Sequence, residues 1–366
     1  MECLFFVELV FSGCLKRRLK KSKIRHILTH FTLMKILLVR MSSMGDLVHT
    51  LPAIEDLSLA RPDIELHWLC EESFADIARL HPFVKQIHTL KWRAWRKKIV
   101  SHETITAIGC LKKSLSSQHF DFVLDSQGLI KSAAFAKFAH APIYGLDKHS
   151  AREPFASHFY RQKYFVERHR NAVWRNRKLF SQVFGYAFDE NKVIFGARLP
   201  ESDLLPISSE MPHYHIALTA TSADKKLWAE ENWRTLFMLM HQKDGLPILL
   251  PFGNLAEEER ANRIANGLPF VSLCDKMSLL KAAAVLANAQ SIIGVDTGLL
   301  HLANAFNRPT IGIYTATDPA KTGVIESQTA QNLGNIGTIP STEEVFQAWQ
   351  RVRQAEKRID YSKLLK

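Results

Sequence analysis

Residues 34–52 read MKILLVRMSSMGDLVHTLP, and this stretch decides the fold. The apolar run 35–40 has the length and the β-branched content of a strand that is buried on both faces. A small polar turn with one glycine follows at 41–46, and the apolar residues from Leu47 to Leu57 then have helical spacing. Strand, tight turn and helix open a doubly wound α/β domain, in which ligands bind beyond the carboxyl ends of the strands.

Asp46 is the one ionisable group in this turn. One interpretation is a helix N-cap, because an aspartate side chain accepts hydrogen bonds from free backbone N–H groups. The other is a carboxylate that works on a bound ligand. The turn by itself leaves both roles open.

Composition indicates a soluble globular chain of two domains. The 366 residues are 46% hydrophobic and 23% charged, and no apolar run approaches the roughly 20 residues that span a bilayer. The net charge is +12, of which residues 1–33 carry +5 (seven Lys and Arg against two Glu), so the remainder carries about +7. Such a balance favours an anionic partner: nucleic acid, an anionic membrane or a phosphorylated substrate.

The five cysteines are odd in number, widely scattered and without a C-x-x-C spacing. This pattern predicts neither a zinc site nor a disulfide framework. We therefore expect a reducing, cytoplasmic setting.

Residues 1–33 differ from the rest, because an apolar patch precedes a basic cluster, the reverse of a secretory signal. A basic membrane-surface segment is one interpretation. We favour a leader outside the fold, since a core strand starts directly after Met34.

Further strand-like runs occur, and each ends in small polar residues or glycine: 120–124, 215–218, 247–250, 291–295 and 310–314. They predict two parallel sheets that present their carboxyl-end loops to a ligand. The segment 189–212 lacks periodicity and is typical of a linker. We predict two Rossmann-like domains facing each other across a cleft, at 34–205 and 206–345, and a C-terminal helix at 346–366 that packs back toward the first domain.

Residues 91–98 read KWRAWRKK. A charge run is most often a solvated face. Two tryptophans among five cations also suit a docking loop for an acidic amphiphile, or single-stranded nucleic acid, although no nucleic-acid-binding motif accompanies them.

Residues 294–301, GVDTGLLH, place an Asp-Thr-Gly turn before a predicted helix at 299–306, and the N-terminus of such a helix binds phosphate. His301 lies in its first turn; a buried structural histidine is the alternative. Lys226 could neutralise a pyrophosphate, and Glu257 could bond ribose hydroxyls. The usual dinucleotide and P-loop motifs are absent from the sequence, and no Asp-x-Asp pair is placed to hold a metal.

Several long motifs resemble the lipopolysaccharide heptosyltransferases of glycosyltransferase family 9: MKILLVRMSSMGDLVHTLPAI, DSQGLIKSAA, SAREPFASHFY, PFGNLAEEERANRIA, KMSLLKAAAVLANAQ and VDTGLLHLANAFNRPTIGIYTATDP. The resemblance covers residues 34–350. It implies a GT-B fold and transfer of L-glycero-D-manno-heptose from ADP-heptose to the inner Kdo of Kdo-lipid A, with inversion. It further implies no cofactor or metal, no nucleic acid, and a cytoplasmic monomer in peripheral contact with the inner membrane.

The resemblance also implies site residues. Asp46 matches the family's catalytic base. The positions that match the ADP-heptose pocket are Thr221, Ser222, Lys226, Glu257, Met277, Asp296, Thr297, Gly298 and His301. The positions expected to meet the acidic acceptor are Arg93, Arg96, Lys97, Lys98, Lys131 and Arg152. Ser222, Phe252 and the charge order at 223–225 depart from the family pattern.

Three alternatives stay open. A sister enzyme that adds the second heptose would share the donor site. A non-hydrolysing nucleotide-sugar epimerase would need further acid and base groups in the cleft. A non-catalytic nucleotide-sugar binding module would be expected to lack Asp46, which is present.

Overall fold

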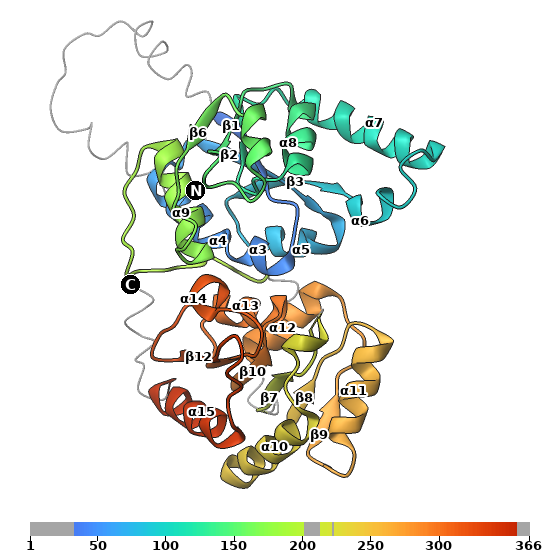
Figure 1. Cartoon of the computed structure of the whole chain (residues 1–366), viewed down its shortest axis with the longest axis vertical. Helices are drawn as coiled ribbons and strands as arrows, with labels where there is room; N and C mark the ends of the chain where they lie inside the picture. The colour runs from blue at the N-terminus through green and yellow to red at the C-terminus, as the bar shows by residue number, and fades with distance from the viewer. Residues whose placement is uncertain (1–32, 201–212, 222, 357–366) are drawn as a thin grey trace, which may run out of the picture. The chain divides into compact units, whose positions relative to one another are not determined.

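The computed structural model describes residues 33–200, 213–221 and 223–356. From Lys35 onward the chain forms one compact unit with two six-stranded sheets, in which every strand pair is parallel (Figure 1). The predicted α/β class with two Rossmann-like sheets is therefore confirmed. Almost all of the predicted leader, 1–33, and the predicted boundary at 205/206 lie outside the described residues.

The first sheet has the order β3-β2-β1-β4-β5-β6. Its strands are β1 (Met34–Val39), β2 (Ile64–Glu71), β3 (Val84–Leu90), β4 (Phe122–Asp125), β5 (Ile143–Leu146) and β6 (Gln162–Tyr164). β1 is central, and its residues 36–39 are fully buried, as a continuous apolar run requires when helices cover both faces of a parallel sheet. Val39 lies opposite Asp125, so the loops after β1 and β4 leave the same edge.

The helices of this domain are α3 (Met44–Val48), α4 (Leu51–Ala60), α5 (Ala75–Arg79), α6 (Trp92–Trp95), α7 (His102–Ser116), α8 (Ile130–Ala136) and α9 (Ala172–Phe184), with 3₁₀ turns η1 (Glu72–Phe74), η2 (Lys137–Ala139) and η3 (Pro154–Phe159). The single helix expected after the first turn is two helices, α3 and α4. Pro52 lies in the first turn of α4. It has no N–H to donate to the carbonyl of Val48, so the hydrogen-bond ladder cannot continue through it.

The second sheet has the order β12-β11-β10-β7-β8-β9. Its strands are β7 (His215–Leu218), β8 (Ile248–Leu250), β9 (Val271–Leu273), β10 (Ser291–Val295), β11 (Thr310–Tyr314) and β12 (Ala330–Gly334). Its helices are η5 (Asp224–Lys226), α10 (Glu230–Asp244), α11 (Leu255–Ala265), α12 (Leu279–Asn288), α13 (Gly298–Ala305), α14 (Pro319–Thr322) and α15 (Thr342–Glu356). β7 and β10 are neighbours, so the segments that follow them lie at one carboxyl edge.

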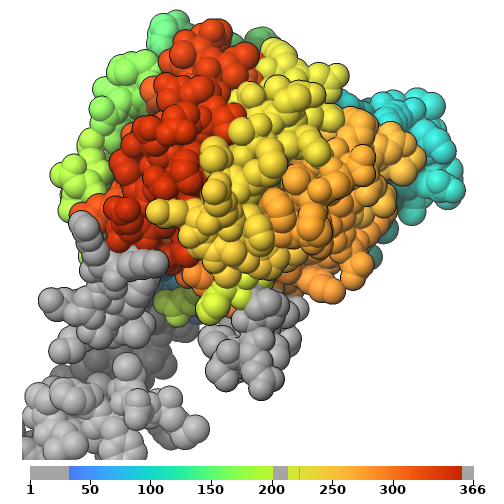
Figure 2. All heavy atoms as spheres, turned by 90° about the horizontal axis from the view of Figure 1, so that it is seen from below, coloured from blue at the N-terminus to red at the C-terminus, as the bar shows by residue number. Residues whose placement is uncertain are grey.

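The C-terminal helix, predicted to pack back toward the first domain, packs differently. In α15, the side chains of Val345, Ala348, Trp349 and Val352 belong to the core of the second domain, and α15 contacts α10, β11 and β12. Figure 2 shows α15 (red) beside α10 (yellow). The prediction is wrong for the helix up to Glu356, because its apolar stripe is used on the second sheet; residues 357–366 lie outside the described residues.

Candidate active site

The turn after β1 holds Asp46 in the first turn of α3. Ser43 is the N-cap, and its backbone N–H and its hydroxyl both donate to Asp46 Oδ2, at 2.8 and 3.0 Å. Arg40 Nη2 lies 3.3 Å from Oδ1. Burial raises the pKa of Asp46, but the Arg40 charge and the Ser43 hydrogen bonds outweigh it, so the pKa is lower than the ordinary value. Asp46 is therefore an ionised carboxylate, with 32% of its side chain exposed.

The segment after β4 supports this turn. Gln127 Oε1 accepts from the N–H of Met41 at 2.8 Å, and the carbonyl of Ser126 accepts from Arg40 Nη1 at 2.6 Å. Asp125 is fully buried and accepts hydrogen bonds from Ser132 and Tyr160, both at 2.7 Å. The Asp-Ser-Gln-Gly motif thus has a structural role in placing Arg40 and, through it, Asp46.

Asp296 follows β10 and is the centre of a polar network in the second domain. Its Oδ2 accepts from Lys226 Nζ at 2.7 Å and from Thr317 Oγ1 at 2.8 Å, and its Oδ1 lies 3.6 Å from His301 Nε2. Burial raises the pKa of Asp296, yet His301, Lys226 and Thr317 together hold it well below its usual range. The Thr221 hydroxyl donates to the Asp296 carbonyl at 2.8 Å, which ties the segment after β7 to the one after β10.

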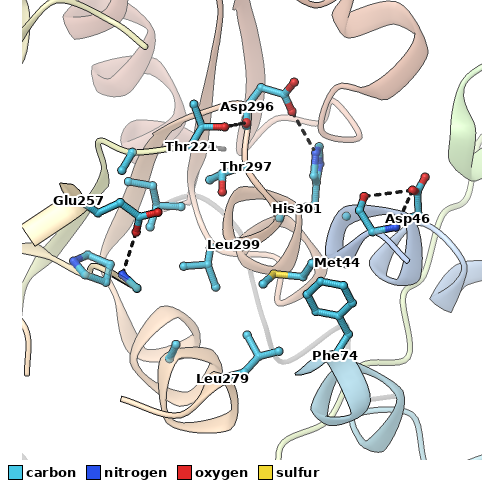
Figure 3. A pocket seen from close by; sticks show the side chains of 18 of the residues that line it. Met44, Asp46, Phe74, Thr221, Glu257, Leu279, Asp296, Thr297, Leu299 and His301 are labelled. Carbon is cyan, nitrogen blue, oxygen red and sulfur yellow. Dashed lines mark hydrogen bonds and ion pairs between the residues drawn. The ribbon is translucent and has the colours of Figure 1, made fainter. Parts of the chain in front are cut away.

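Helices α3 and α13 meet where these two turns face each other. The rings of His49 and His301 pack edge to face with centroids 4.4 Å apart. Gly298 and Gly45 allow the close approach, since a Cβ on Gly298 would lie 2.8 Å from Met44 Cβ. Figure 3 shows Asp46 on one side of His301 and Asp296 on the other.

A cavity of about 770 Å³ lies between the two turns (Figure 3). It is lined by nine of the residues predicted for catalysis and the donor: Asp46, Thr221, Lys226, Glu257, Met277, Asp296, Thr297, Gly298 and His301. The N-terminus of α13 also opens into it, and the dipole end of a helix favours an anion. Ser222, the remaining predicted donor residue, lies outside the described residues.

Glu257 has a second role besides lining the cavity. Its carboxylate accepts from the Gly253 N–H and from Asn254 Nδ2, both at 2.8 Å, while Asn254 caps the N–H of Glu257. These contacts fix the start of α11 and engage both oxygens of the carboxylate.

The predicted acceptor residues divide into two groups. Arg93 and Arg152 line the cavity. Arg96, Lys97 and Lys98 are exposed and are not among the described residues that line it. Lys131 does not line it either; its pKa is lowered by burial and by the neighbouring charges of Arg96 and Arg152.

The two tryptophans of α6 are placed differently from the docking interpretation. Trp92 and Trp95 are partly buried against the core of the first domain, where both rings contact Phe135. Arg93 lies over the ring of Phe74, 4.7 Å from its centroid. The aromatic rings therefore anchor α6, and the cations are what this segment offers to a partner.

Sequence reasoning missed several residues around Asp46. A second, smaller cavity of about 250 Å³ adjoins it and is lined by five basic residues that were not predicted, Arg40, Arg168, Arg170, Arg175 and Lys321, and by the predicted Arg152. His49 was also missed: it is buried, and neither ring nitrogen has a hydrogen-bond partner among the described residues. The spacing of three between Asp46 and His49, one helical turn, was the available signal.

Within the described chain, no helix is both long and apolar enough to cross a membrane, and no cluster of His, Cys, Asp and Glu side chains is arranged to hold a metal ion.

Two Rossmann-like sheets whose carboxyl edges share one cavity define the fold class, which is the GT-B type. The model of glycosyltransferase family 9 (heptosyltransferase) matches residues 108–349. The lipopolysaccharide heptosyltransferase 1 of Escherichia coli K12 is 40% identical over 291 residues, 79% of this chain and 90% of the relative. That of Pseudomonas aeruginosa is 40% identical over 79% of this chain and 81% of its own.

Solved structures of a heptosyltransferase match this chain as well. E. coli heptosyltransferase WaaC with ADP has a TM-score of 0.77 at 36% identity and covers 88% of this chain and 99% of its own. The same protein with ADP-2-deoxy-2-fluoro heptose has a TM-score of 0.76. The chain belongs to glycosyltransferase family 9, the heptosyltransferases.

Proposed function

We propose that this enzyme transfers L-glycero-D-manno-heptose from ADP-heptose to the inner Kdo of Kdo-lipid A, with inversion at the anomeric carbon. The observation that carries the proposal is the shared cavity, in which Asp46 from one domain faces Lys226, Asp296 and the α13 N-terminus from the other. The relatives named lipopolysaccharide heptosyltransferase 1 and the WaaC structures with ADP and an ADP-heptose analogue support it.

The donor site supplies positive charge where ADP departs. Lys226 and the first N–H groups of α13 face the cavity, and both stabilise a diphosphate that gains charge as the glycosidic bond breaks. Lys226 is paired with Asp296 in this structure, so we propose that Asp296 holds the lysine in place and shares it with the diphosphate. We propose no metal and no cofactor for this step.

Asp46 supplies the base. A sugar hydroxyl becomes a good nucleophile when a carboxylate accepts its proton. The Kdo oxygen then attacks the anomeric carbon, the bond to the diphosphate breaks with its electron pair, and ADP leaves in a single displacement that inverts the centre. Thr221, Glu257, Met277, Thr297, Gly298 and His301 complete the proposed donor pocket, and Ser222, which lies outside the described residues, remains a prediction.

The acceptor side is basic. Arg93 and Arg152 at the cavity, together with the smaller basic cavity beside Asp46, suit the carboxylates and phosphates of Kdo-lipid A. We propose Arg96, Lys97, Lys98 and Lys131, which do not line the cavity, as a second and outer set of contacts with the anionic acceptor. We propose a monomeric cytoplasmic enzyme that works at the inner membrane face and does not act on nucleic acid.

The second candidate is the sister reaction, addition of the second heptose. It is favoured less, because a relative named heptosyltransferase 2 is 30% identical over only 37% of this chain.

The test measures ADP release from ADP-heptose with two acceptors, Kdo-lipid A and Kdo-lipid A that already carries one heptose. We expect turnover with the first acceptor only. Turnover confined to the second acceptor would establish the sister reaction. If neither acceptor led to ADP release, heptosyl transfer to this core would be refuted.

A further inference from the structure

A compact projection of the first domain combines exposed apolar and cationic side chains. It comprises the turn after α6 and the start of α7, and we call its six residues the tip: Arg96, Lys97, Lys98, Ile99, Val100 and Ile105. In Figure 1, α6 and the start of α7 lie at the margin of this domain.

The apolar residues of the tip are unusually open to solvent. Val100 is 86% exposed, Ile105 59% and Ile99 51%. Single exposed apolar residues are ordinary on protein surfaces, but a contiguous group indicates an interaction site. These three belong to one turn and the helix that follows it.

Main-chain hydrogen bonds fix the turn that carries these exposed side chains. The Lys98 N–H donates to the Trp95 carbonyl at 2.9 Å, and the Ser101 N–H donates to the Lys98 carbonyl at 3.0 Å. Ser101 then caps α7 through the Thr104 N–H. Since Trp92 and Trp95 anchor the other side of α6 in the core, Ile99 and Val100 are presented by a fixed turn.

The charge around these residues is strongly positive. Residues 91–113 contain seven cations (Lys91, Arg93, Arg96, Lys97, Lys98, Lys112 and Lys113) and a single carboxylate, Glu103. Among the described residues, Lys91 is paired with Glu72, whereas Arg96, Lys97 and Lys98 form no ion pair.

We infer that the tip docks on an anionic lipid bilayer, with Ile99, Val100 and Ile105 entering the boundary between headgroups and acyl chains and Arg96, Lys97 and Lys98 contacting the headgroup phosphates. Apolar side chains beside several cations are what an anionic membrane surface binds. A single-stranded nucleic acid is a poorer partner, because it would need exposed aromatic rings for stacking, and Trp92 and Trp95 face the core.

The inference rests on the proposed function in one respect: docking is useful because the proposed acceptor is a lipid. Arg93 belongs to α6 and lines the cavity, so a docked tip brings the cavity close to the membrane surface. The docking itself requires neither substrate.

The experiment is co-sedimentation of the full chain with vesicles of phosphatidylglycerol and phosphatidylethanolamine, without acceptor or donor. The test variant is Ile99→Ser with Val100→Ser. Its matched control is Ile336→Ser with Ile339→Ser, two similarly exposed isoleucines of the second domain. We expect the tip variant to bind about 10-fold more weakly and the control to bind like the unchanged chain.

A second variant removes the charges: Arg96→Gln, Lys97→Gln and Lys98→Gln. We expect binding about 100-fold weaker, because each cation near an anionic surface contributes, and we expect high salt to weaken the unchanged chain similarly. Vesicles of phosphatidylcholine alone should bind both the unchanged chain and this variant weakly.

Folding is checked with the thermal midpoint and with turnover on a deacylated, water-soluble acceptor, both of which Ile99→Ser with Val100→Ser should leave unchanged. Equal vesicle binding by the unchanged chain and both tip variants would overturn the inference, whichever other segment, residues 1–33 included, bound the vesicles. Binding of single-stranded RNA without binding of vesicles would overturn it as well. Failure of heptosyl transfer with every acceptor would count against the proposed function alone, since vesicle binding is measured without substrates.

Discussion

Asp46 and Asp296 each follow a central strand of a parallel sheet, Asp46 in the first turn of α3 and Asp296 just before α13, yet the two domains hold them differently. Asp46 accepts from Ser43 and lies beside Arg40, and it keeps 32% of its side chain exposed. Asp296 has only 10% of its side chain exposed, and it accepts hydrogen bonds from Lys226 and Thr317, with His301 close by. The same strand–turn–helix unit therefore presents one open carboxylate and one enclosed carboxylate to the same cavity.

The difference suggests a division of work. A carboxylate has about four acceptor positions, and a proton can be taken only at a position that is free. Asp46 retains exposed surface toward the cavity, which suits a base. Both carboxylates are contacted on both oxygens, so the difference between them is exposure. Asp296 is enclosed and accepts from Lys226 and Thr317 on Oδ2, which suits an anchor for Lys226 in the donor site.

The largest effect should follow Asp46→Asn. Asparagine can still accept the Ser43 N–H but cannot take a proton, so kcat should fall by about 10²–10⁴-fold, while the free energy of unfolding changes by less than about 1 kcal/mol. Steady-state kinetics and chemical denaturation measure the two. Asp63→Asn, at a surface pair with Arg61, is the control; near-normal turnover in Asp46→Asn would reduce Asp46 to a helix-capping residue.

The pH profile of the unchanged enzyme tests the same role of Asp46 as a base. Because the pKa of Asp46 is lower than 3.8, the carboxylate stays ionised well below neutrality. From this group we expect kcat to be level from pH 7 to about pH 5 and to fall only on further acidification. A loss of kcat already near pH 6, absent in Asp46→Asn, would mean that the base has a raised pKa.

Lys226→Ala should have the next largest effect. Removing a charge-assisted contact to the diphosphate should weaken ADP binding by about 10–100-fold, measured by titration calorimetry. Lys225→Ala, its neighbour in η5, is the matched control. Unchanged ADP affinity in Lys226→Ala would mean that the lysine serves Asp296 only.

Gly298→Ala tests the approach of the two helices. The added Cβ would lie 2.6–2.8 Å from three side-chain atoms of Met44, including its Cβ, so α3 and α13 must separate. We expect a loss of about 1–3 kcal/mol in the free energy of unfolding together with lower turnover. Gly109→Ala, where nothing lies within 4 Å, should be neutral or slightly stabilising; equal behaviour of the two variants would show that the contact is not tight.

His49 should produce the smallest effect. Burial and the neighbouring His301 lower its pKa from 6.5 to about 3. The unfolded chain therefore binds a proton at pH 5.5 that the folded chain excludes, and stability falls as the pH drops below 6.5. Between pH 7 and 5.5 the unchanged chain should lose about 1 kcal/mol more than His49→Phe. Parallel stability curves would show that His49 is protonated in the fold.

Much of the fold is predictable because a fully buried strand has a continuous apolar sequence. Residues 36–39 and 291–295 are of this kind. Short strands such as β6 and β9, each of three residues, carry too little pattern. The apolar stripe of α15 predicts that the helix buries one face, but which sheet it packs on depends on the shape of that sheet. The predicted packing toward the first domain was therefore wrong for the helix up to Glu356.

For the site, chemistry-bearing residues that follow strand ends, such as Asp46, Thr221 and Asp296, were predictable from the pattern, whereas Met277 came from the family resemblance alone; the cavity gathers all four. The burial of Trp92 and Trp95 was not, because an aromatic residue in a basic run has the same sequence signature whether it faces the core or a ligand. Arg40 and His49 were missed for a related reason: their roles depend on Ser126 and His301, more than 80 residues away in the chain.

The division of work between the two aspartates is tested most directly by titrating Asp46→Asn and Asp296→Asn with ADP-heptose under identical conditions. We predict that Asp46→Asn binds the donor with the affinity of the unchanged chain, since its carboxylate acts on the acceptor hydroxyl. We predict that Asp296→Asn binds about 10-fold more weakly, because Lys226 and His301 lose the charge that positions them. Equal losses of donor affinity in the two variants would contradict the account.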